Sequence, residues 1–152
     1  MNFLFMTTSQ HNEHGVKVSA SSVFRSRLEK NVWAIYENTR NKKLISENDN
    51  VVFYVSDHKA GGQLCGIAVV DERRKPLRNE RFHSEHGAVE YFISFKDVTV
   101  FDATIKFRDI ITELSFCPKN LAKWGVILMG GVRRLNDEDF DLIRQRCLTL
   151  NR

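Results

Sequence analysis

The sequence predicts an α+β fold in which about six mostly antiparallel strands curl toward a barrel, flanked by two or three helices. Short apolar runs rich in β-branched and aromatic residues recur along the chain and indicate strands. The helical patterns are mixed with these strands and do not alternate with them. The length of 152 residues, with 42% hydrophobic and 28% charged residues, suits a single domain over residues 1–152.

In the first half of the chain, the residue patterns predict one helix and several strands. Residues 2–6 are apolar and read as a buried strand, and residues 32–36 resume an extended aromatic pattern. Serines at 19–22 offer N-caps for a helix on which Phe24 and Leu28 share a face. The next two strands are predicted at residues 50–56 and 64–70. They form an antiparallel hairpin that is broken by the glycines at 61 and 62.

The second half begins with a charged, loop-like stretch over residues 71–87. Strands are predicted next at 90–95 and 98–101 with a turn at 96–97, and a last strand at 125–129. A short helix fits 108–114. The final helix is the clearest element. Asn136 can cap it, three acids occupy its first turn, and Phe140, Ile143 and Cys147 share one face.

Composition limits the class of function only weakly. The 23 Lys and Arg residues exceed the 19 Asp and Glu residues, giving a net charge of +4. This bias fits a partner that carries phosphates, and it fits a solvated basic surface equally well. The three cysteines form no CxxC pair and read as small buried thiols in a reducing compartment. With no basic leader and no apolar run of about 20 residues, we expect a cytoplasmic protein without membrane contact.

Motifs for catalysis are missing from the sequence. It contains no GxSxG, P-loop, GxGxxG or HExxH pattern, and its acids are scattered. The histidine pairs His11/His14 and His83/His86 have a spacing that could bind a metal, but both lie in loop-like polar sequence. We therefore predict no catalytic residue, no metal and no cofactor, and we expect a binding protein and not an enzyme.

The most informative segment is residues 31–44, NVWAIYENTRNKKL. Its two aromatic residues, Trp33 and Tyr36, are followed by amide and cationic side chains, namely Asn38, Arg40, Asn41, Lys42 and Lys43. Rings stack on bases, amides read base edges and cations neutralise phosphates, so this pattern favours a nucleic-acid site. A core position for both rings beside a solvated loop is the alternative. A second basic run at 71–81 could line a backbone groove or be a charged surface loop.

The order of these pieces resembles the EVE domains of the PUA-like superfamily. The segment NVWAIYENTRNKKLISENDNVVFYVSDHKAGGQLCGIAVV matches their Trp-containing stretch, their GDxVxFYxS strand and their GxxxV strand, with Asn48 where many members have Gly. The later KDVTVF and LSFCPKNLAKWGVILMGGVRRLNDEDFDLI match a strand, a LxFxxxxxxWG block and a closing RxLxxxDFxxI helix. The resemblance covers nearly the whole chain. EVE domains are similar to YTH readers of methylated adenine in RNA, and more distantly to ASCH and SRA-type modules. The stretch KNVWAI followed by FYVSDHKAGGQLCGIA looks YTH-like as well.

The resemblance implies a pseudo-barrel with a pocket for a flipped or single-stranded modified base. Trp33 would be the main wall of an aromatic cage, and Phe82 stands where family members often have the second Trp. The full set implied for the pocket is Trp33, Thr8, Ser9, His11, Tyr54, Ser56, Phe82, Ala34, Asn38 and Trp124. The cations we assign to phosphate contacts are Arg25, Arg40, Lys42, Lys43, Arg73 and Arg74.

The expected function is recognition of a methylated base, with DNA favoured and RNA open. Such a module could give specificity to a restriction system whose nuclease or NTPase motor lies on another chain. A reader of methylated adenine or another modified base in RNA is one alternative. A PUA-like enzyme using Ser9, His11, Asp57 or His58 is a second alternative. A protein-interaction scaffold with a filled pocket is a third, and it predicts that Trp33 is buried.

Overall fold

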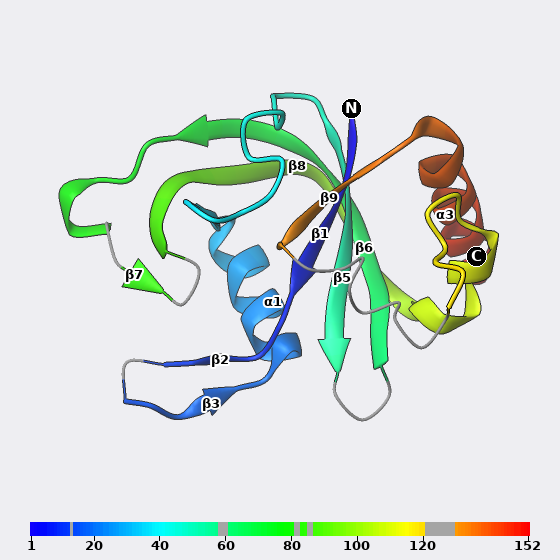
Figure 1. The fold of residues 1–152 in the computed structure, drawn as a ribbon, viewed down its shortest axis with the longest axis horizontal. Helices are drawn as coiled ribbons and strands as arrows, with labels where there is room; N and C mark the ends of the chain where they lie inside the picture. The colour runs from blue at the N-terminus through cyan, green and yellow to red at the C-terminus, as the bar shows by residue number, and fades with distance from the viewer. Residues whose placement is uncertain (13, 58–60, 81–82, 85–86, 121–129) are drawn as a thin grey trace.

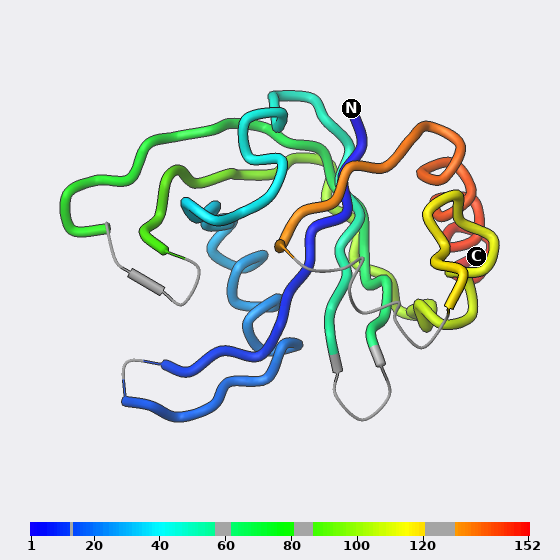
Figure 2. Tube along the Cα trace, in the orientation of Figure 1, coloured from blue at the N-terminus to red at the C-terminus, as the bar shows by residue number. Residues whose placement is uncertain are grey.

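The computed structural model describes residues 1–12, 14–57, 61–80, 83–84, 87–120 and 130–152 (Figure 2). Its main sheet runs in the spatial order β4-β8-β6-β5-β1-β9, and β7 pairs on β8. The strands are β1 (Asn2–Thr7), β4 (Trp33–Tyr36), β5 (Asn50–Asp57), β6 (Gly61–Arg74), β7 (His83–Ser84), β8 (Gly87–Lys106) and β9 (Val132–Leu135). β1 pairs β5 in parallel and the other pairs are antiparallel. The described residues thus confirm the predicted α+β class and the curled sheet (Figure 1).

Two helices cover opposite faces of this sheet. α1 (Ala20–Lys30) packs on one face, and α3 (Asp137–Leu150) lies on the other with the 3-10 helices η2 (Phe107–Asp109) and η3 (Ile111–Glu113) (Figure 1). A small hairpin of β2 (Gln10–His11) and β3 (Lys17–Val18) projects beside the start of α1. The third 3-10 turn, η1 (Arg78–Glu80), follows β6.

The central strands supply both cores because their side chains alternate between the two faces. On β1, Phe3 and Phe5 join the core under α1, while Leu4 and Met6 join the core under α3. β5 repeats this alternation with Phe53 toward α1 and its neighbours toward α3. All six residues of β1 are buried, as expected for a strand that is covered on both faces.

Both helices begin at N-caps that the sequence predicts, and a tertiary contact reinforces the end of α1. The Ser19 side chain accepts a hydrogen bond from the Ser22 backbone N–H at the start of α1. At its end Asn31 adopts a left-handed φ of 50°, and its amide bonds both the N–H and the C=O of Phe95 on β8. Asn136 caps α3 by accepting from the N–H of Asp139. These caps fix where each helix leaves the sheet.

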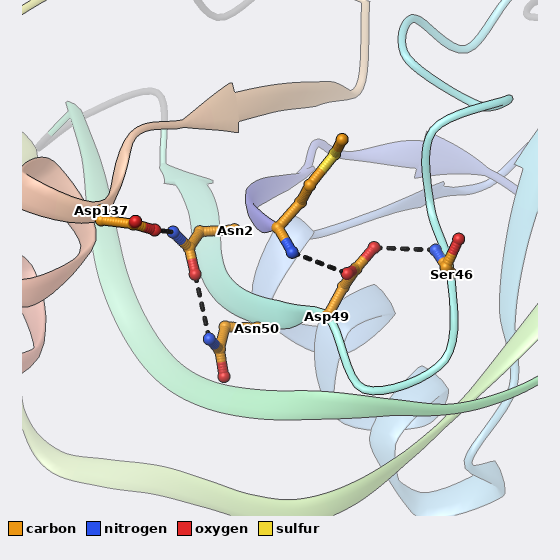
Figure 3. A network of polar contacts seen from close by, with 6 residues as sticks. Asn2, Ser46, Asp49, Asn50 and Asp137 are labelled. Atoms are coloured by element: carbon orange, nitrogen blue, oxygen red, sulfur yellow. Dashed lines mark hydrogen bonds and ion pairs between the residues drawn. The ribbon is translucent and has the colours of Figure 1, made fainter.

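A polar network joins the starts of β1, β5 and α3 (Figure 3). Asn2 donates to Asp137 at 2.7 Å and accepts from Asn50 at 2.9 Å, so one buried amide links three elements. Asp49 accepts from the Ser46 N–H and from the ammonium group of Met1, each at 2.8 Å. Buried amides and carboxylates are tolerated because their hydrogen-bonding groups are satisfied.

Four sequence-based expectations about elements need correction or lie outside the described residues. Residues 71–74 extend β6, because they pair with β8 through Arg74. The expected turn at 96–97 is a register shift within one continuous β8, with Asp97 at a φ of 52°. Residues 108–114 form 3-10 turns and not an α-helix. The strand at 132–135 was not predicted, and the one expected at 125–129 lies outside the described residues.

Candidate nucleic-acid interface

A cavity of about 500 Å³ lies where the two edge strands of the sheet approach each other. β4 and β9 stand at opposite ends of the strand order, yet Ala34 and Tyr36 of β4 line this cavity together with Val132 of β9. The turn after β4 bridges the gap. The Arg40 N–H donates to the Gly130 C=O at 2.9 Å, and the Asn41 side chain donates to the Val132 C=O at 3.0 Å. We call this space the seam cavity.

The walls of the seam cavity combine rings with uncharged hydrogen-bonding groups. Its aromatic residues are Trp33, Tyr36 and Tyr54. Its polar side chains are Thr8, Gln10, Asn38, Thr39 and Ser56. Arg27 from α1 is the one charged side chain among the described residues that line it. Such a mixture of flat apolar surface with a few polar groups is typical of small-ligand sites and suits a heteroaromatic ring.

Trp33 belongs to the core as much as to the cavity, because only 2% of its surface is exposed. Its ring stacks on Phe53 with centroids 5.3 Å apart and an interplanar angle of 27°. Further ring contacts come from Phe5, Phe24 and Phe95. A cage wall must offer a face to its ligand, and this packing leaves little of one. The burial of Trp33 is also what the scaffold alternative predicts.

Arg27 covers part of the Trp33 ring face on which a base could otherwise stack. Its guanidinium carbon lies 4.6 Å from the Trp33 ring centroid, a cation–π distance. Burial lowers the pKa of Arg27, and the hydrogen bond and charge interaction with Tyr36 offset this in part. No role was predicted for Arg27 from the sequence. Nothing in the helical spacing shows that β4 lies beneath it.

Tyr54 owes its position to a glycine on the neighbouring strand. A Cβ atom built on Gly62 would lie 1.8 Å from the Tyr54 ring, so only glycine leaves room for that ring. Burial raises the pKa of Tyr54, and a hydrogen bond from the Gly62 backbone partly opposes the rise. Tyr54 is 6% exposed and also packs edge-on against Phe107. The predicted break at these glycines is wrong, because Gly61 and Gly62 lie inside β6 and pair with Asp57 and Ser56 of β5. Gly62 instead shapes the cavity wall by leaving room for the Tyr54 ring.

The structure brings together six of the ten residues that the resemblance implied for the pocket. They are Trp33, Thr8, Tyr54, Ser56, Ala34 and Asn38, and all line the seam cavity. His11 lines an adjoining cavity. Ser9 is partly buried and lies between Thr8 and Gln10, which both line the seam cavity. Phe82 and Trp124 lie outside the described residues, as does His58. Asp57 ends β5. Which of these side chains contact a ligand stays a prediction.

Most of the expected phosphate contacts gather elsewhere. Lys42, Lys43, Arg73 and Arg74 line a second hollow of about 360 Å³ together with Lys75, Glu90 and Tyr91, which we call the basic groove. The turn at residues 37–43 separates the two spaces, since Asn38 and Thr39 line the seam cavity and Lys42 lines the groove. Arg25 is exposed on α1, away from the groove. Arg40 lies beside Gly130 at the rim of the seam cavity, where a Cβ would meet its side chain at 2.5 Å.

Several cations of the basic groove already have partners. Lys42 donates to the Glu37 C=O at 2.6 Å and pairs with Glu90 at 2.7 Å. Arg73 donates to the Ile45 C=O at 2.7 Å while lying over the Tyr91 ring. The Tyr91 hydroxyl donates to the Lys42 C=O, and burial raises the pKa of Tyr91 to about 12. These contacts orient the groove, and they leave less of its charge available than the sequence suggested.

Over the described ranges, no group of three or more His, Cys, Asp or Glu side chains is arranged to hold a metal ion. No helix in the same part of the chain is long and apolar enough to cross a membrane.

Comparison with known proteins identifies relatives in sequence and in structure. No family model matches the chain. A UPF0310 protein of Pyrococcus abyssi is 33% identical over 124 residues, covering 76% of this chain and 85% of the relative. The DUF55 domain of human thymocyte nuclear protein 1 superposes with a TM-score of 0.62 at 14% identity, covering 96% of this chain and 98% of that one.

Two other solved structures share the fold. Human THYN1 in complex with DNA containing 5-methylcytosine superposes with a TM-score of 0.57 at 14% identity, over 95% of this chain and 96% of that one. The N-terminal domain of Staphylothermus marinus McrB gives a TM-score of 0.50 at 7% identity, over 95% and 93%. At these identities the likeness concerns the fold, and it confirms the fold that the sequence resemblance implied. The chain belongs to the UPF0310 family and has the EVE-type, PUA-like fold.

Proposed function

We propose that the protein binds DNA and recognises a methylated base that enters the seam cavity. The observation that carries this proposal is the make-up of that cavity, in which rings, uncharged polar groups and Arg27 surround about 500 Å³. Pockets for small ligands span about 300–1,000 Å³, so one base fits. Its edge would meet donors and acceptors such as Asn38 and Ser56, and a methyl group would gain from apolar contact with Ala34 or Tyr54.

The structural relatives support DNA and methylated cytosine as the first ligands to test. THYN1, which shares the fold, has been crystallised with DNA that contains 5-methylcytosine. The McrB domain, which also shares it, supports a place in a restriction system, with a nuclease or NTPase motor on another chain as the partner. A base inside a duplex must leave the stack to enter a cavity, at a cost of a few kcal/mol.

The basic groove would hold the nucleic-acid backbone while the base is read. Lys43 and Lys75 are exposed there, and Arg40 lies at the rim of the seam cavity. Phosphate contacts of this kind add affinity but carry no sequence information. Selectivity for the modified base would therefore come from the seam cavity alone, and the two contributions can be separated experimentally by salt.

The test is a fluorescence-polarisation titration with matched oligonucleotides. DNA and RNA strands would carry cytosine, 5-methylcytosine, adenine or N6-methyladenine at one position. We expect about a ten-fold preference, or 1.4 kcal/mol, for one methylated DNA strand. Thr8→Phe places a ring at an exposed position on the cavity wall and should abolish the preference. Thr112→Phe makes the same change at an exposed site on η3 and serves as its control.

The outcomes distinguish the competing functions. Preference for a methylated RNA strand, sensitive to a ribose hydroxyl, would replace DNA by RNA as the ligand. Equal weak affinity for all strands, lost as salt rises, would reduce the protein to a general basic surface. Chemical conversion of the bound strand would establish the enzyme alternative. Unchanged selectivity in Thr8→Phe would remove the seam cavity as the reading site.

A further inference from the structure

A third space, of about 570 Å³, adjoins the seam cavity. It lies between α1, the β2–β3 hairpin, β4 and η1, and we call it the helix–hairpin cavity. The two cavities share Gln10, Arg27, Ala34 and Tyr36 on their walls. Because Arg27 hydrogen-bonds Tyr36, these two side chains form a polar partition between the spaces. Each space is large enough for one nucleotide by the ordinary size of ligand pockets.

The helix–hairpin cavity carries unbalanced positive charge. Arg27 and Lys30, one turn apart on α1, both line it. Glu80 is the one acid among the described lining residues, and Arg74 already engages it through two hydrogen bonds of 2.8 and 3.0 Å. The Leu77 N–H donates a third bond to Glu80. The charge of Glu80 is therefore committed outside the cavity, which leaves the two α1 cations to attract an anion.

Arg27 is placed to reach into both cavities at once. Its guanidinium offers five donors, and among the residues that the structure describes its hydrogen-bond partner is Tyr36. Within the described ranges, no carboxylate forms an ion pair with Arg27, although its pKa is lowered by burial. A partly buried guanidinium between two cavities, with donors to spare, suits a phosphate oxygen.

We propose that the helix–hairpin cavity binds the nucleotide next to the methylated one, and that Arg27 and Lys30 contact the phosphate joining the two. This inference rests on the proposed function, because the first nucleotide must occupy the seam cavity. In this arrangement the DNA backbone passes from one cavity to the other at the Arg27–Tyr36 partition. The protein then reads a methylated base together with one covalently linked neighbour, and an isolated methylated nucleoside is an incomplete ligand.

The decisive probe is a five-nucleotide DNA strand with 5-methylcytosine at its centre. Replacing one phosphate by a neutral methylphosphonate, on the 5′ or the 3′ side of that base, removes one charge and keeps the linkage. Neutralising the phosphate on one side should weaken binding about ten-fold, the effect expected for a lost charged hydrogen bond. Neutralising the other side should change it far less.

Protein variants then assign the contact. Lys30→Gln and Arg27→Gln should each bind the natural strand more weakly and should lose most of the sensitivity to the neutral linkage, as in a double-mutant cycle. The salt slope should fall by about 0.7 for each single-strand phosphate contact removed. Arg108→Gln, at an exposed position on η2, is the matched control and should behave as wild type. Lys30 is exposed, so its variant tests the contact even if Arg27→Gln fails to fold.

The possible results distinguish failure of the second subsite from failure of the proposed function. If wild type prefers the methylated strand but tolerates a neutral linkage on either side, the second subsite is overturned and the reader function stands. If Lys30→Gln and Arg27→Gln keep full sensitivity to the neutral linkage, the contact belongs to other cations and the assignment is overturned. If wild type shows no preference for the methylated strand, the proposed function and the subsite fail together.

Discussion

The Arg27 guanidinium lies over the Trp33 indole ring, with its central carbon 4.6 Å from the ring centroid. Phe53 stacks on the same indole, so the tryptophan is held between a cation and a phenyl ring and is 2% exposed. A base can stack on Trp33 only if Arg27 moves toward another partner. In the proposed complex, a backbone phosphate is that partner. Binding of the phosphate by Arg27 would then uncover the Trp33 ring for stacking.

Trp33→Ala should destabilise the fold by about 3–5 kcal/mol, the usual cost of removing a core aromatic. The reason is the loss of four ring contacts in the core under α1. Urea unfolding monitored by circular dichroism would measure it. Trp33→Phe keeps a smaller ring and should cost clearly less. A Trp33→Ala protein of unchanged stability would show that the side chain is not part of the core.

Gly62→Ala should displace the Tyr54 ring, because the added Cβ would lie 1.8 Å from it. We expect a loss of about 1–3 kcal/mol, typical of overpacking, together with weaker binding of the methylated strand. Combining Gly62→Ala with Tyr54→Ala removes the clash, so the double variant should be less destabilised than the sum of the single changes. Additive losses would mean that the backbone shifts at Gly62 and leaves the Tyr54 ring in place.

Asp139→Ala should destabilise the packing of α3 against the segment after η3. The Asp139 carboxylate accepts from the Ser115 N–H at 3.0 Å and from the Ser115 hydroxyl at 2.5 Å, and the residue is buried. Leaving these donors unsatisfied should cost about 1–3 kcal/mol. Asp141→Ala, exposed on the same helix, is the control for lost charge and helix propensity. Equal effects of the two changes on the unfolding midpoint would contradict a specific anchor.

The Glu80 carboxyl should titrate far below its ordinary range. The hydrogen bonds from Arg74, then that from the Leu77 N–H, lower the pKa of Glu80 to about 2. A lowered folded-state pKa stabilises the fold above the unfolded value near 4.5, and this contribution is lost as the pH falls toward 2. Arg74 is exposed and Glu80 is partly exposed, so the effect on overall stability should be small. NMR titration would give the pKa, and in Arg74→Gln it should return toward 4.5.

Two of the three thiols should be unreactive in the folded protein. Burial raises the pKa of Cys65 and of Cys147 to about 11, and Cys147 has no exposed surface. Because the thiolate is the reactive form, alkylation by iodoacetamide at pH 8 should be slow at both sites and fast after unfolding in urea. Mass spectrometry of digested protein would locate the labels. Rapid labelling of Cys147 without denaturant would show that α3 opens readily.

The sequence by itself determined the elements whose signals are local. The apolar run of β1, the serine cap of α1 and the Asn136 cap of α3 all formed where expected, because capping and side-chain periodicity act within a few residues. The resemblance of ordered motifs also anticipated the fold. Local signals failed at Asp97, where a predicted turn is a bulge, because cross-strand pairing with β6 keeps the chain extended.

Only the tertiary structure decided what the seam cavity contains. An aromatic run such as 33–36 fits a core and a cage equally well, and burial of Trp33 depends on which rings the curled sheet brings against it. Arg27 became a cavity residue because α1 places it over the Trp33 ring of β4, and Gly130 because the turn after β4 hydrogen-bonds it just before β9. Gly130 and β4 are far apart in the chain, as are Phe53 and Trp33. Their meeting is set by the closure of the sheet, which no short stretch of sequence encodes.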